Sequence, residues 1–364
     1  MVPVVDLSRR GRLVAATFAE SAAAVSASGT YLLGDQTRSF EHEFGQWLDA
    51  PFVSAVSSGA AALQLALAAL GIGDGDEVIV PAFTAVPTAS AVCAVGAVPV
   101  PVDVQHDTAN LDPTLVAAAT TERTKAIIVV HLYGRPATIP QPGFDDGNDD
   151  GNGDGDRIAI IEDAAQAHGA IVHDGRSAAT AYSFYPTKNL GGIGDGGAIV
   201  TSDAQLDEKV RRLRTHGMTE VYVHEQISQN FRMSEIEAAW LRVGLTRVHA
   251  DNDRRRAIAA HYRAVAPDAR WQRDHDRHVF HLCVLRTGDR DGFRRRMAAR
   301  AVATAVHYPL AITQQPAYRR FVREPCPEAQ AWARECVSVP CFPELTDGEV
   351  EDVAKAIASS AASR

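Results

Sequence analysis

Short, uniformly apolar runs alternate with longer segments of helical spacing along the first two thirds of the chain. Apolar runs bounded by turn residues predict strands at 52–56, 77–81, 98–102, 125–130, 157–161 and 198–202. Helices are predicted between them, at 60–70, 84–95 and 115–121. Strands that are apolar throughout are buried on both faces, so this alternation predicts an α/β fold: a mostly parallel sheet sandwiched by helices.

The pattern changes after residue 245. We expect a basic helix, two short strands and a closing helix, at 254–266, 278–285, 302–307 and 346–359. A long helix predicted around 234–247 would form the junction. The sequence therefore predicts a large domain over residues 1–245 and a smaller C-terminal α/β domain over 246–364.

An Asp- and Gly-rich segment over 142–156 interrupts the large domain. It can bury almost nothing, so we expect a mobile surface loop there. Asp150 to Gly155 begins like an EF-hand loop, but Ile161 stands where the bidentate glutamate belongs and no helix precedes the segment. We therefore expect no metal site.

The composition excludes several classes of protein. The chain has 364 residues, 46% of them hydrophobic and 22% charged, which is typical of a soluble globular protein. The net charge of −9 gives no indication of nucleic-acid binding, and no apolar stretch suits a membrane span. The start of the chain lacks the pattern of a signal peptide. Five cysteines without a Cys-x-x-Cys pair favour reduced thiols in the cytoplasm.

Lysine is rare in this chain, and one lysine stands apart from the others. Only four of the 36 basic residues are lysines, and Lys188 alone lies between a proline and a glycine cluster, in Ser183-Phe-Tyr-Pro-Thr-Lys-Asn-Leu-Gly191. Arginine can replace lysine as a surface cation, but its guanidinium cannot form a Schiff base with an aldehyde. A solvated turn lysine remains an equally good interpretation of Lys188 when it is considered alone.

Two further segments lie where strands and helices meet. Ser58, Gly59 and Ala60 open a helix, whose free amide groups suit a phosphate, although a plain serine N-cap is the simpler alternative. Asp163 directly follows a predicted buried strand and suits a protonated pyridine nitrogen, or else a helix N-cap. Together with Lys188, these segments supply the three groups that pyridoxal 5′-phosphate (PLP) requires of a protein.

Over nearly its whole length the chain resembles the DegT/DnrJ/StrS-type PLP-dependent nucleotide-sugar aminotransferases, which have the fold-type-I aspartate aminotransferase architecture. The resemblance is most specific in Glu162-Asp-Ala-Ala-Gln-Ala-His-Gly169 and in the segment from Ser183 to Gly191. It implies that Lys188 forms the Schiff base with the cofactor and then moves the proton. It also implies that Asp163 pairs with the pyridine nitrogen and that Gln166 contacts the 3-oxygen side of the ring.

The resemblance implies further roles. Ser58, Ser183 and the amides of Gly59 and Ala60 would hold the phosphate, although many members have a threonine at position 60. Phe83 would stack on the ring. Asn230 would reach the phosphate of the other subunit's cofactor. The active sites would therefore lie at the interface of a homodimer. His307 and Tyr308 would border the sugar pocket.

We therefore expect a cytoplasmic, homodimeric aminotransferase that moves an amino group from an amino acid, L-glutamate, to a ketone of a nucleotide-linked deoxysugar, without a nucleic-acid or membrane partner. Three alternatives stay open. A PLP-dependent sugar dehydratase is disfavoured, since the dehydratases that resemble this chain carry histidine in place of Lys188. The acceptor could instead be a cyclitol or an aminobenzoate-type precursor. The chain could also be a catalytically silent PLP-binding regulator.

Overall fold

The computed structural model describes residues 1–140, 158–171 and 173–361. The segment 142–156, for which a mobile loop is expected, lies outside these residues. No helix in the described part of the chain is long and apolar enough to cross a membrane.

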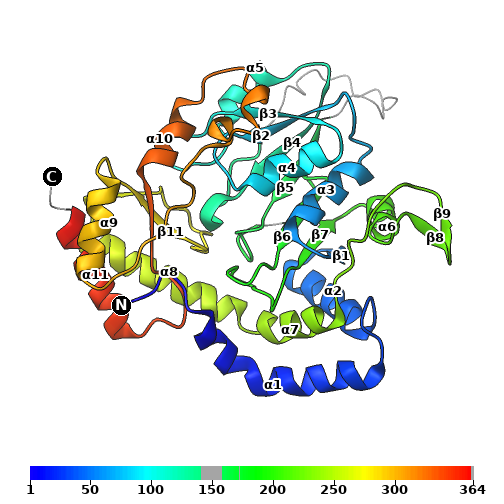
Figure 1. Ribbon diagram of the computed structural model, residues 1–364, viewed down its shortest axis with the longest axis horizontal. Coiled ribbons are helices and arrows are strands. Elements are labelled where there is room, and N and C mark those ends of the chain that lie inside the picture. Colours follow the sequence, from blue (N-terminus) through cyan, green and yellow to red (C-terminus); the bar gives the residue numbers. More distant parts are fainter. Residues whose placement is uncertain (141–157, 172, 362–364) are drawn as a thin grey trace.

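A seven-stranded sheet forms the centre of the molecule (Figure 1). Its strand order is β1 (Phe52–Val56), β7 (Gly197–Thr201), β6 (Ala179–Ser183), β5 (Ala159–Asp163), β4 (Thr124–Val130), β2 (Glu77–Pro81) and β3 (Val98–Val102). β7 pairs antiparallel with both of its neighbours, and the other pairs are parallel. The predicted mostly parallel sheet is confirmed.

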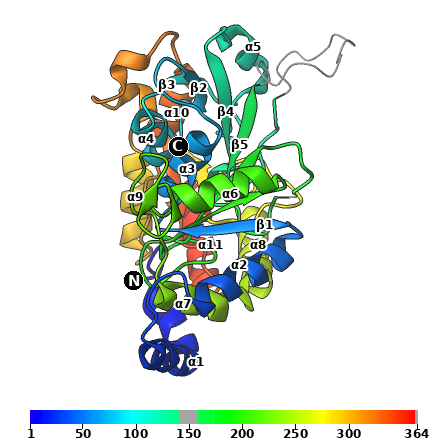
Figure 2. The same cartoon turned by 90° about the vertical axis from the view of Figure 1, so that its right-hand side faces the viewer.

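Both faces of this sheet are buried, as the uniformly apolar strands predict. On β7, Ile199 packs into one apolar cluster while Ala198 and Val200 pack into another, because successive side chains of a strand point to opposite faces. The first cluster includes α3 (Gly59–Ala69), α4 (Val86–Ala94) and α6 (Ala204–Leu213). The second includes α2 (Asp35–Leu48) and α7 (Glu235–Leu245). The long α1 (Leu7–Ser28) packs on α7 at one end of the molecule (Figure 2).

A second, antiparallel sheet contains β10 (Arg270–Trp271), β11 (Cys283–Arg286) and β12 (Cys336–Val339). It shares an apolar cluster with α8 (Val248–Val265), α9 (Arg290–Ala299) and α11 (Asp347–Ala361). Val2 joins this cluster and bridges to Val302. Trp332 on α10 (Pro327–Glu335) packs instead into the core of the large sheet. The division into domains over 1–245 and 246–364 stays a prediction.

Two strand predictions in this second part are wrong. Only the end of 278–285 is a strand, because the amides of Val279 and Leu282 donate to the carbonyls of Gly134 and Tyr133 in the large sheet's loops. The segment 302–307 forms no strand, since its amides donate to two different partners: Ala303 to Val2, and Ala305 to Ser338. Backbone groups that are paired in this way are not free to form the regular hydrogen bonds of a β-sheet.

The remaining short elements of the described chain include α5 (Val116–Ala119) and a hairpin of β8 (Met218–Glu220) and β9 (Val223–His224). The hairpin projects beyond α6 at the edge of the molecule (Figure 1).

Candidate active site

Lys188 lies in the turn that follows β6. Its amide donates to the Tyr185 carbonyl (2.8 Å), and its own carbonyl accepts from Nη1 of Arg10 (3.1 Å). Gly191 allows this turn to close, since a Cβ there would come within 2.2 Å of the Pro186 oxygen. Burial lowers the pKa of the Lys188 amine to about 8, while the nearby Asp163 charge opposes the change. A neutral, nucleophilic amine is therefore accessible close to neutral pH.

Asp163 is the last residue of β5, rather than the first residue after it as the sequence predicted, and its side chain is only 6% exposed. Oδ2 accepts a hydrogen bond from Thr88 Oγ1 (3.0 Å), and Oδ1 accepts one from the Ala165 amide (3.1 Å). Burial raises the pKa of this carboxyl, while those hydrogen bonds and the charge of Lys188 lower it. Asp163 is thus a buried carboxyl group that two hydrogen bonds hold in place. A carboxyl group fixed in this way suits a protonated pyridine nitrogen.

Gln166 connects the Asp163 loop to the residues expected at the sugar pocket. Its Oε1 accepts from the Tyr133 amide (2.7 Å), and its Nε2 donates to the Tyr308 hydroxyl (3.1 Å). The Tyr308 ring lies edge-on to Phe83, with ring centroids 6.3 Å apart. Three of the predicted site residues are therefore in one contiguous group.

The start of α3 has the free amides that the predicted anion site needs. Ser58 is the N-cap, and its Oγ accepts from the Ala61 amide (3.0 Å), so the simpler alternative is also correct. The amides of Gly59 and Ala60 have no acceptor within the described chain. A Cβ on Gly59 would lie 2.6 Å from Cβ of Ser183, so glycine is what allows this helix start to meet the end of β6. Unpaired amides at a helix N-terminus are a ready site for a phosphate.

A cavity of about 450 Å³ opens over Lys188. Thr187, His307 and Tyr308 contribute to its polar wall, and His307 is held by a hydrogen bond between its Nδ1 and Ser338 Oγ (2.9 Å). The amine, the carboxylate and the unpaired amides fit the aldehyde, the ring nitrogen and the phosphate of PLP. Bound there, PLP supplies an electron sink for proton removal at the substrate's amine-bearing carbon.

The model of the DegT/DnrJ/EryC1/StrS aminotransferase family matches residues 13–358 of this chain. The chain belongs to that family. It is 41% identical over 362 residues to dTDP-3-amino-3,4,6-trideoxy-α-D-glucose transaminase of Streptomyces venezuelae, covering 94% of this chain and 92% of the relative. It is 36% identical over 365 residues to a UDP-N-acetyl-3-dehydro-α-D-glucosamine 3-aminotransferase of Acidithiobacillus ferrooxidans, covering 98% and 97%.

Among solved structures, S. venezuelae DesV in complex with a ketimine intermediate superposes with a TM-score of 0.90 at 38% identity, covering 100% of this chain and 99% of that one. This likeness confirms the predicted fold. As a member of the family, the protein is a PLP-dependent aminotransferase.

The side chain of one predicted site residue makes no hydrogen bond to the others. Asn230 is exposed, and its Oδ1 accepts from Nε of Arg232 (2.9 Å) rather than from any group around Lys188. Its expected role, contact with a partner subunit's cofactor, stays a prediction.

Several residues that support the site carry no sequence signal. Thr88 meets Asp163 from 75 residues away. Nδ1 of His131 accepts from the Ala137 amide (3.0 Å), so the proton of the ring is on Nε2. Nε2 donates that proton to Glu162 Oε2 (2.9 Å). These pairs depend on how the strands are ordered in the sheet, which no local pattern encodes.

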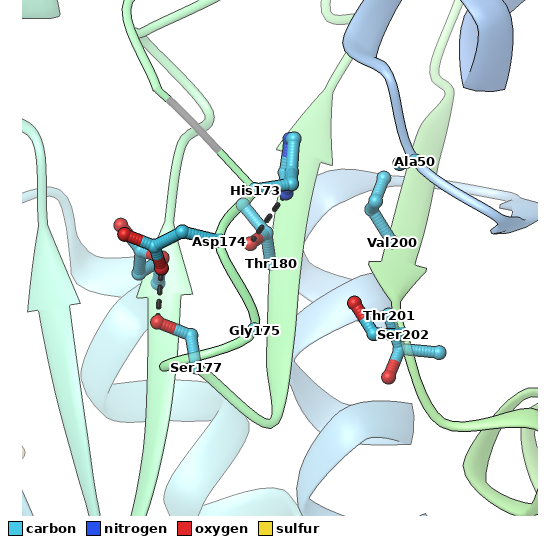
Figure 3. Close-up of a pocket in the computed structure, with 10 residues that line it drawn as sticks. Ala50, His173, Asp174, Gly175, Ser177, Thr180, Val200, Thr201 and Ser202 are labelled. Carbon is cyan, nitrogen blue, oxygen red and sulfur yellow. Dashed lines mark hydrogen bonds between the residues drawn. The ribbon is translucent and has the colours of Figure 1, made fainter.

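A second cavity lies beyond Glu162, and Figure 3 shows the residues that line it. Ser177 donates to Glu162 Oε1 (2.6 Å) at its wall. Its volume of about 10 Å³ has room for about one water molecule, not a substrate. Of these two cavities, the one at Lys188 has room for a substrate.

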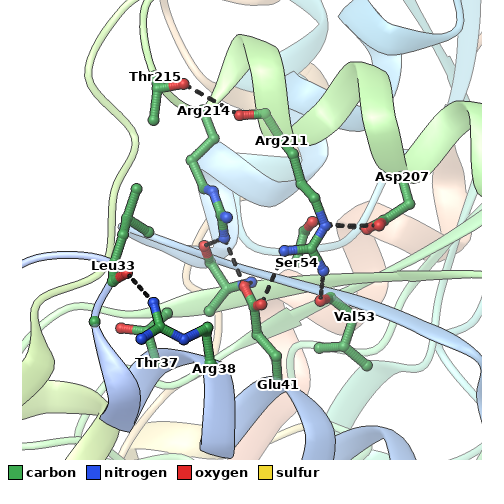
Figure 4. Close-up of polar contacts among 12 residues, drawn as sticks. Leu33, Thr37, Arg38, Glu41, Val53, Ser54, Asp207, Arg211, Arg214 and Thr215 are labelled. Atoms are coloured by element: carbon green, nitrogen blue, oxygen red, sulfur yellow. Dashed lines mark hydrogen bonds and ion pairs between the residues drawn. The ribbon is translucent and has the colours of Figure 1, made fainter. Parts of the chain in front are cut away.

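An ion-pair network fixes the strand that leads to the phosphate cradle (Figure 4). Glu41 on α2 accepts from Nη1 of Arg214 (2.6 Å), Nη1 of Arg211 (2.9 Å) and the Ala55 amide (2.9 Å). Arg214 also donates to the Ala55 carbonyl (2.8 Å). Since β1 is an edge strand, the network satisfies backbone groups that have no neighbouring strand. The start of α3 at Ser58 follows directly from this fixed strand.

Proposed function

We propose that this aminotransferase transfers the amino group of L-glutamate to a ketone of a nucleotide-linked deoxysugar. The observation that carries the proposal is Lys188, whose amine has a pKa of about 8 and lines a cavity large enough for a sugar beside the cofactor. The S. venezuelae and A. ferrooxidans relatives, named for a dTDP-sugar and a UDP-sugar, support the acceptor class.

Each site residue has one task in this proposal. Lys188 holds the cofactor and moves the proton between the substrate carbon and the cofactor. Asp163 keeps the ring nitrogen protonated, and Gln166 fixes the ring's 3-oxygen side. The amides of Gly59 and Ala60, with Ser58 and Ser183, bind the phosphate, and Phe83 covers the ring. His307 and Tyr308 orient the sugar, because both line the cavity beside Lys188.

The proposed enzyme is a cytoplasmic homodimer. An apolar surface at the tip of the β8–β9 hairpin supports the dimer, because Val221 is 78% and Tyr222 88% exposed there. Exposed apolar side chains in such a group mark surfaces that a partner covers. Asn230 follows this hairpin in sequence and would act from there on the partner's cofactor. Sedimentation of the Y222S variant as a monomer would support this arrangement.

The function is tested in two half-reactions. The PLP-loaded enzyme should lose its visible absorbance band with L-glutamate and regain it with a nucleotide keto-sugar. Borohydride should fix the cofactor on Lys188, and Lys188→Ala should abolish that attachment. Loss of a sugar hydroxyl without use of glutamate would indicate a dehydratase, and no response to any amino donor would indicate a regulator. A response to glutamate followed only by reaction with a cyclitol would replace the proposed acceptor.

A further inference from the structure

Tyr133 lies buried in the turn Leu132–Gly134, which follows β4, and its side chain has no exposed surface. Its φ of 64° is in the left-handed region, which bulky residues rarely adopt. The next residue is Gly134, where a Cβ would come within 2.8 Å of the Gln166 carbonyl oxygen. A strained conformation of this kind persists only where the surrounding structure holds it, and such conformations cluster at functional sites.

Two hydrogen bonds depend on this conformation of Tyr133. Its amide donates to Oε1 of Gln166 (2.7 Å), and its hydroxyl donates to the carbonyl oxygen of His307. Nε2 of Gln166 donates in turn to the Tyr308 hydroxyl (3.1 Å). Because His307 and Tyr308 are consecutive, these contacts form a closed ring that begins and ends at Tyr133. One residue thus connects the loop expected at the cofactor with the segment expected at the sugar.

The segment that carries His307 and Tyr308 has little support from the backbone. Residues 306–310 form no backbone–backbone hydrogen bond with the described part of the chain, and the nearest such bonds are at Ala305 and Ala311. The position of this segment therefore depends on the side chains that reach it.

Side chains of β12 and of the turn after β4 hold this segment. The Cys336 thiol donates to the Tyr308 carbonyl oxygen (3.7 Å), and a hydrogen bond joins the Ser338 hydroxyl to Nδ1 of His307 (2.9 Å). Among the described residues, only the Tyr133 hydroxyl bonds the His307 carbonyl oxygen. Removal of that hydroxyl would leave the carbonyl without its donor and take away one of the contacts that fix the segment.

We propose that Tyr133 is a positioning residue for the acceptor half-reaction: its hydroxyl fixes the His307 backbone and so holds the His307 and Tyr308 side chains where they orient the sugar. Both side chains line the cavity over Lys188. Misplacement of a reacting group by about 1 Å can cost on the order of 100-fold in rate, so the wall that orients a sugar must be fixed. The smaller amino-acid donor has less contact with this wall. The inference rests on the proposed transfer to a nucleotide-linked sugar.

The test compares Tyr133→Phe, which removes only the hydroxyl, with Tyr182→Phe. Tyr182 is the matched control, because it is equally buried and its hydroxyl bonds Nε2 of His173 (3.0 Å), away from the cavity. In single turnovers of the pyridoxamine form with a nucleotide keto-sugar, Tyr133→Phe should lower the rate constant on the order of 10-fold. In the PLP form with L-glutamate it should stay within about twofold of wild type. Tyr182→Phe should match the wild type in both half-reactions.

Two further measurements separate positioning from cofactor binding and from a general loss of stability. The PLP affinity and absorbance maximum of Tyr133→Phe should be those of the wild type, because the amide at this position still bonds Gln166. Tyr133→Phe and Tyr182→Phe should unfold at similarly reduced urea concentrations, since each loses one buried hydroxyl contact. If Tyr133→Phe does not fold, Ser338→Ala removes another contact of the same segment and should show the same selective loss with the keto-sugar.

The outcomes distinguish this inference from the proposed function. Equal losses in the two half-reactions, or an unchanged acceptor rate constant in Tyr133→Phe, would overturn the role of Tyr133. A wild-type enzyme that reacts with L-glutamate but with no nucleotide keto-sugar would refute the proposed acceptor. The same comparison would then be made with the ketone that the enzyme accepts, and a selective loss there would still support Tyr133 as a positioning residue.

Discussion

Gly59 is the residue at which packing and cofactor binding are most directly coupled. In Gly59→Ala the new Cβ would lie 2.6 Å from Cβ of Ser183, against about 3.4–4 Å for an ordinary contact. The start of α3 or the end of β6 must therefore move by about 1 Å. Overpacking of this kind costs about 1–3 kcal/mol. The gain from replacing glycine in a helix, at most about 1 kcal/mol, is smaller at this first helical position.

The magnitude follows from these two opposing terms. We expect Gly59→Ala to lower the free energy of unfolding of the cofactor-free enzyme by about 1–2 kcal/mol. The displaced amides of Gly59 and Ala60 should also bind phosphate more weakly. Loss of one charge-assisted hydrogen bond, about 1.5–3 kcal/mol, corresponds to a fall in PLP affinity of roughly 10–150-fold.

The assay combines urea unfolding of the cofactor-free enzyme with titration of PLP, and the chain offers a matched control. Gly11 lies inside α1, and a Cβ there would meet nothing within 4 Å. Gly11→Ala should stabilise the protein by about 0.5–1 kcal/mol and leave PLP affinity unchanged. If Gly59→Ala unfolds like Gly11→Ala and binds PLP as tightly as the wild type does, the close packing of α3 on β6 is wrong.

Two further predictions concern charge. Burial lowers the pKa of Lys188 from its usual 10.5 to about 8, so the neutral fraction of the amine at pH 7 is roughly 300-fold larger. The rate of PLP attachment to the cofactor-free enzyme should therefore rise with pH and level off above pH 8. A midpoint near 10.5 in a stopped-flow series would contradict the burial argument. Glu41→Gln breaks a buried pair with Arg214 and should cost about 3 kcal/mol in urea unfolding. Glu43→Gln, whose partner Arg242 is partly exposed, should cost less than about 1 kcal/mol, and equal costs would refute the role of the buried network.

The sequence predicts six of the seven strands of the large sheet, because these are short and mostly apolar. It does not predict β6, because Thr180 and Ser183 interrupt the apolar run of that strand. The strands of the C-terminal part are less predictable because the partners of their backbone groups decide the outcome. The amides of Val279 and Leu282 donate to a loop of the large sheet, and no local sequence pattern indicates that contact. β12 is short, and its preceding residues form α10, so its apolar run is not isolated by turn residues.

The site residues also form two groups, those that the sequence predicts and those that it does not. Lys188, Asp163 and the start of α3 are predictable because each has a local signature at the end of an element. Thr88 and His131 are not, because each meets its partner, Asp163 or Glu162, only through the order of the strands in the sheet.

Electrostatics connect Lys188 and Asp163 more closely than their separate roles suggest. Burial alone lowers the pKa of the amine and raises that of the carboxyl, and each charge partly offsets the effect of burial on the other. Once the Lys188 amine becomes neutral, Asp163 loses the cation that favours its ionised form. A protonated ring nitrogen beside Asp163 restores that cation. The site therefore favours a ligand that neutralises the lysine and brings a positive nitrogen of its own, which is the combination that PLP provides.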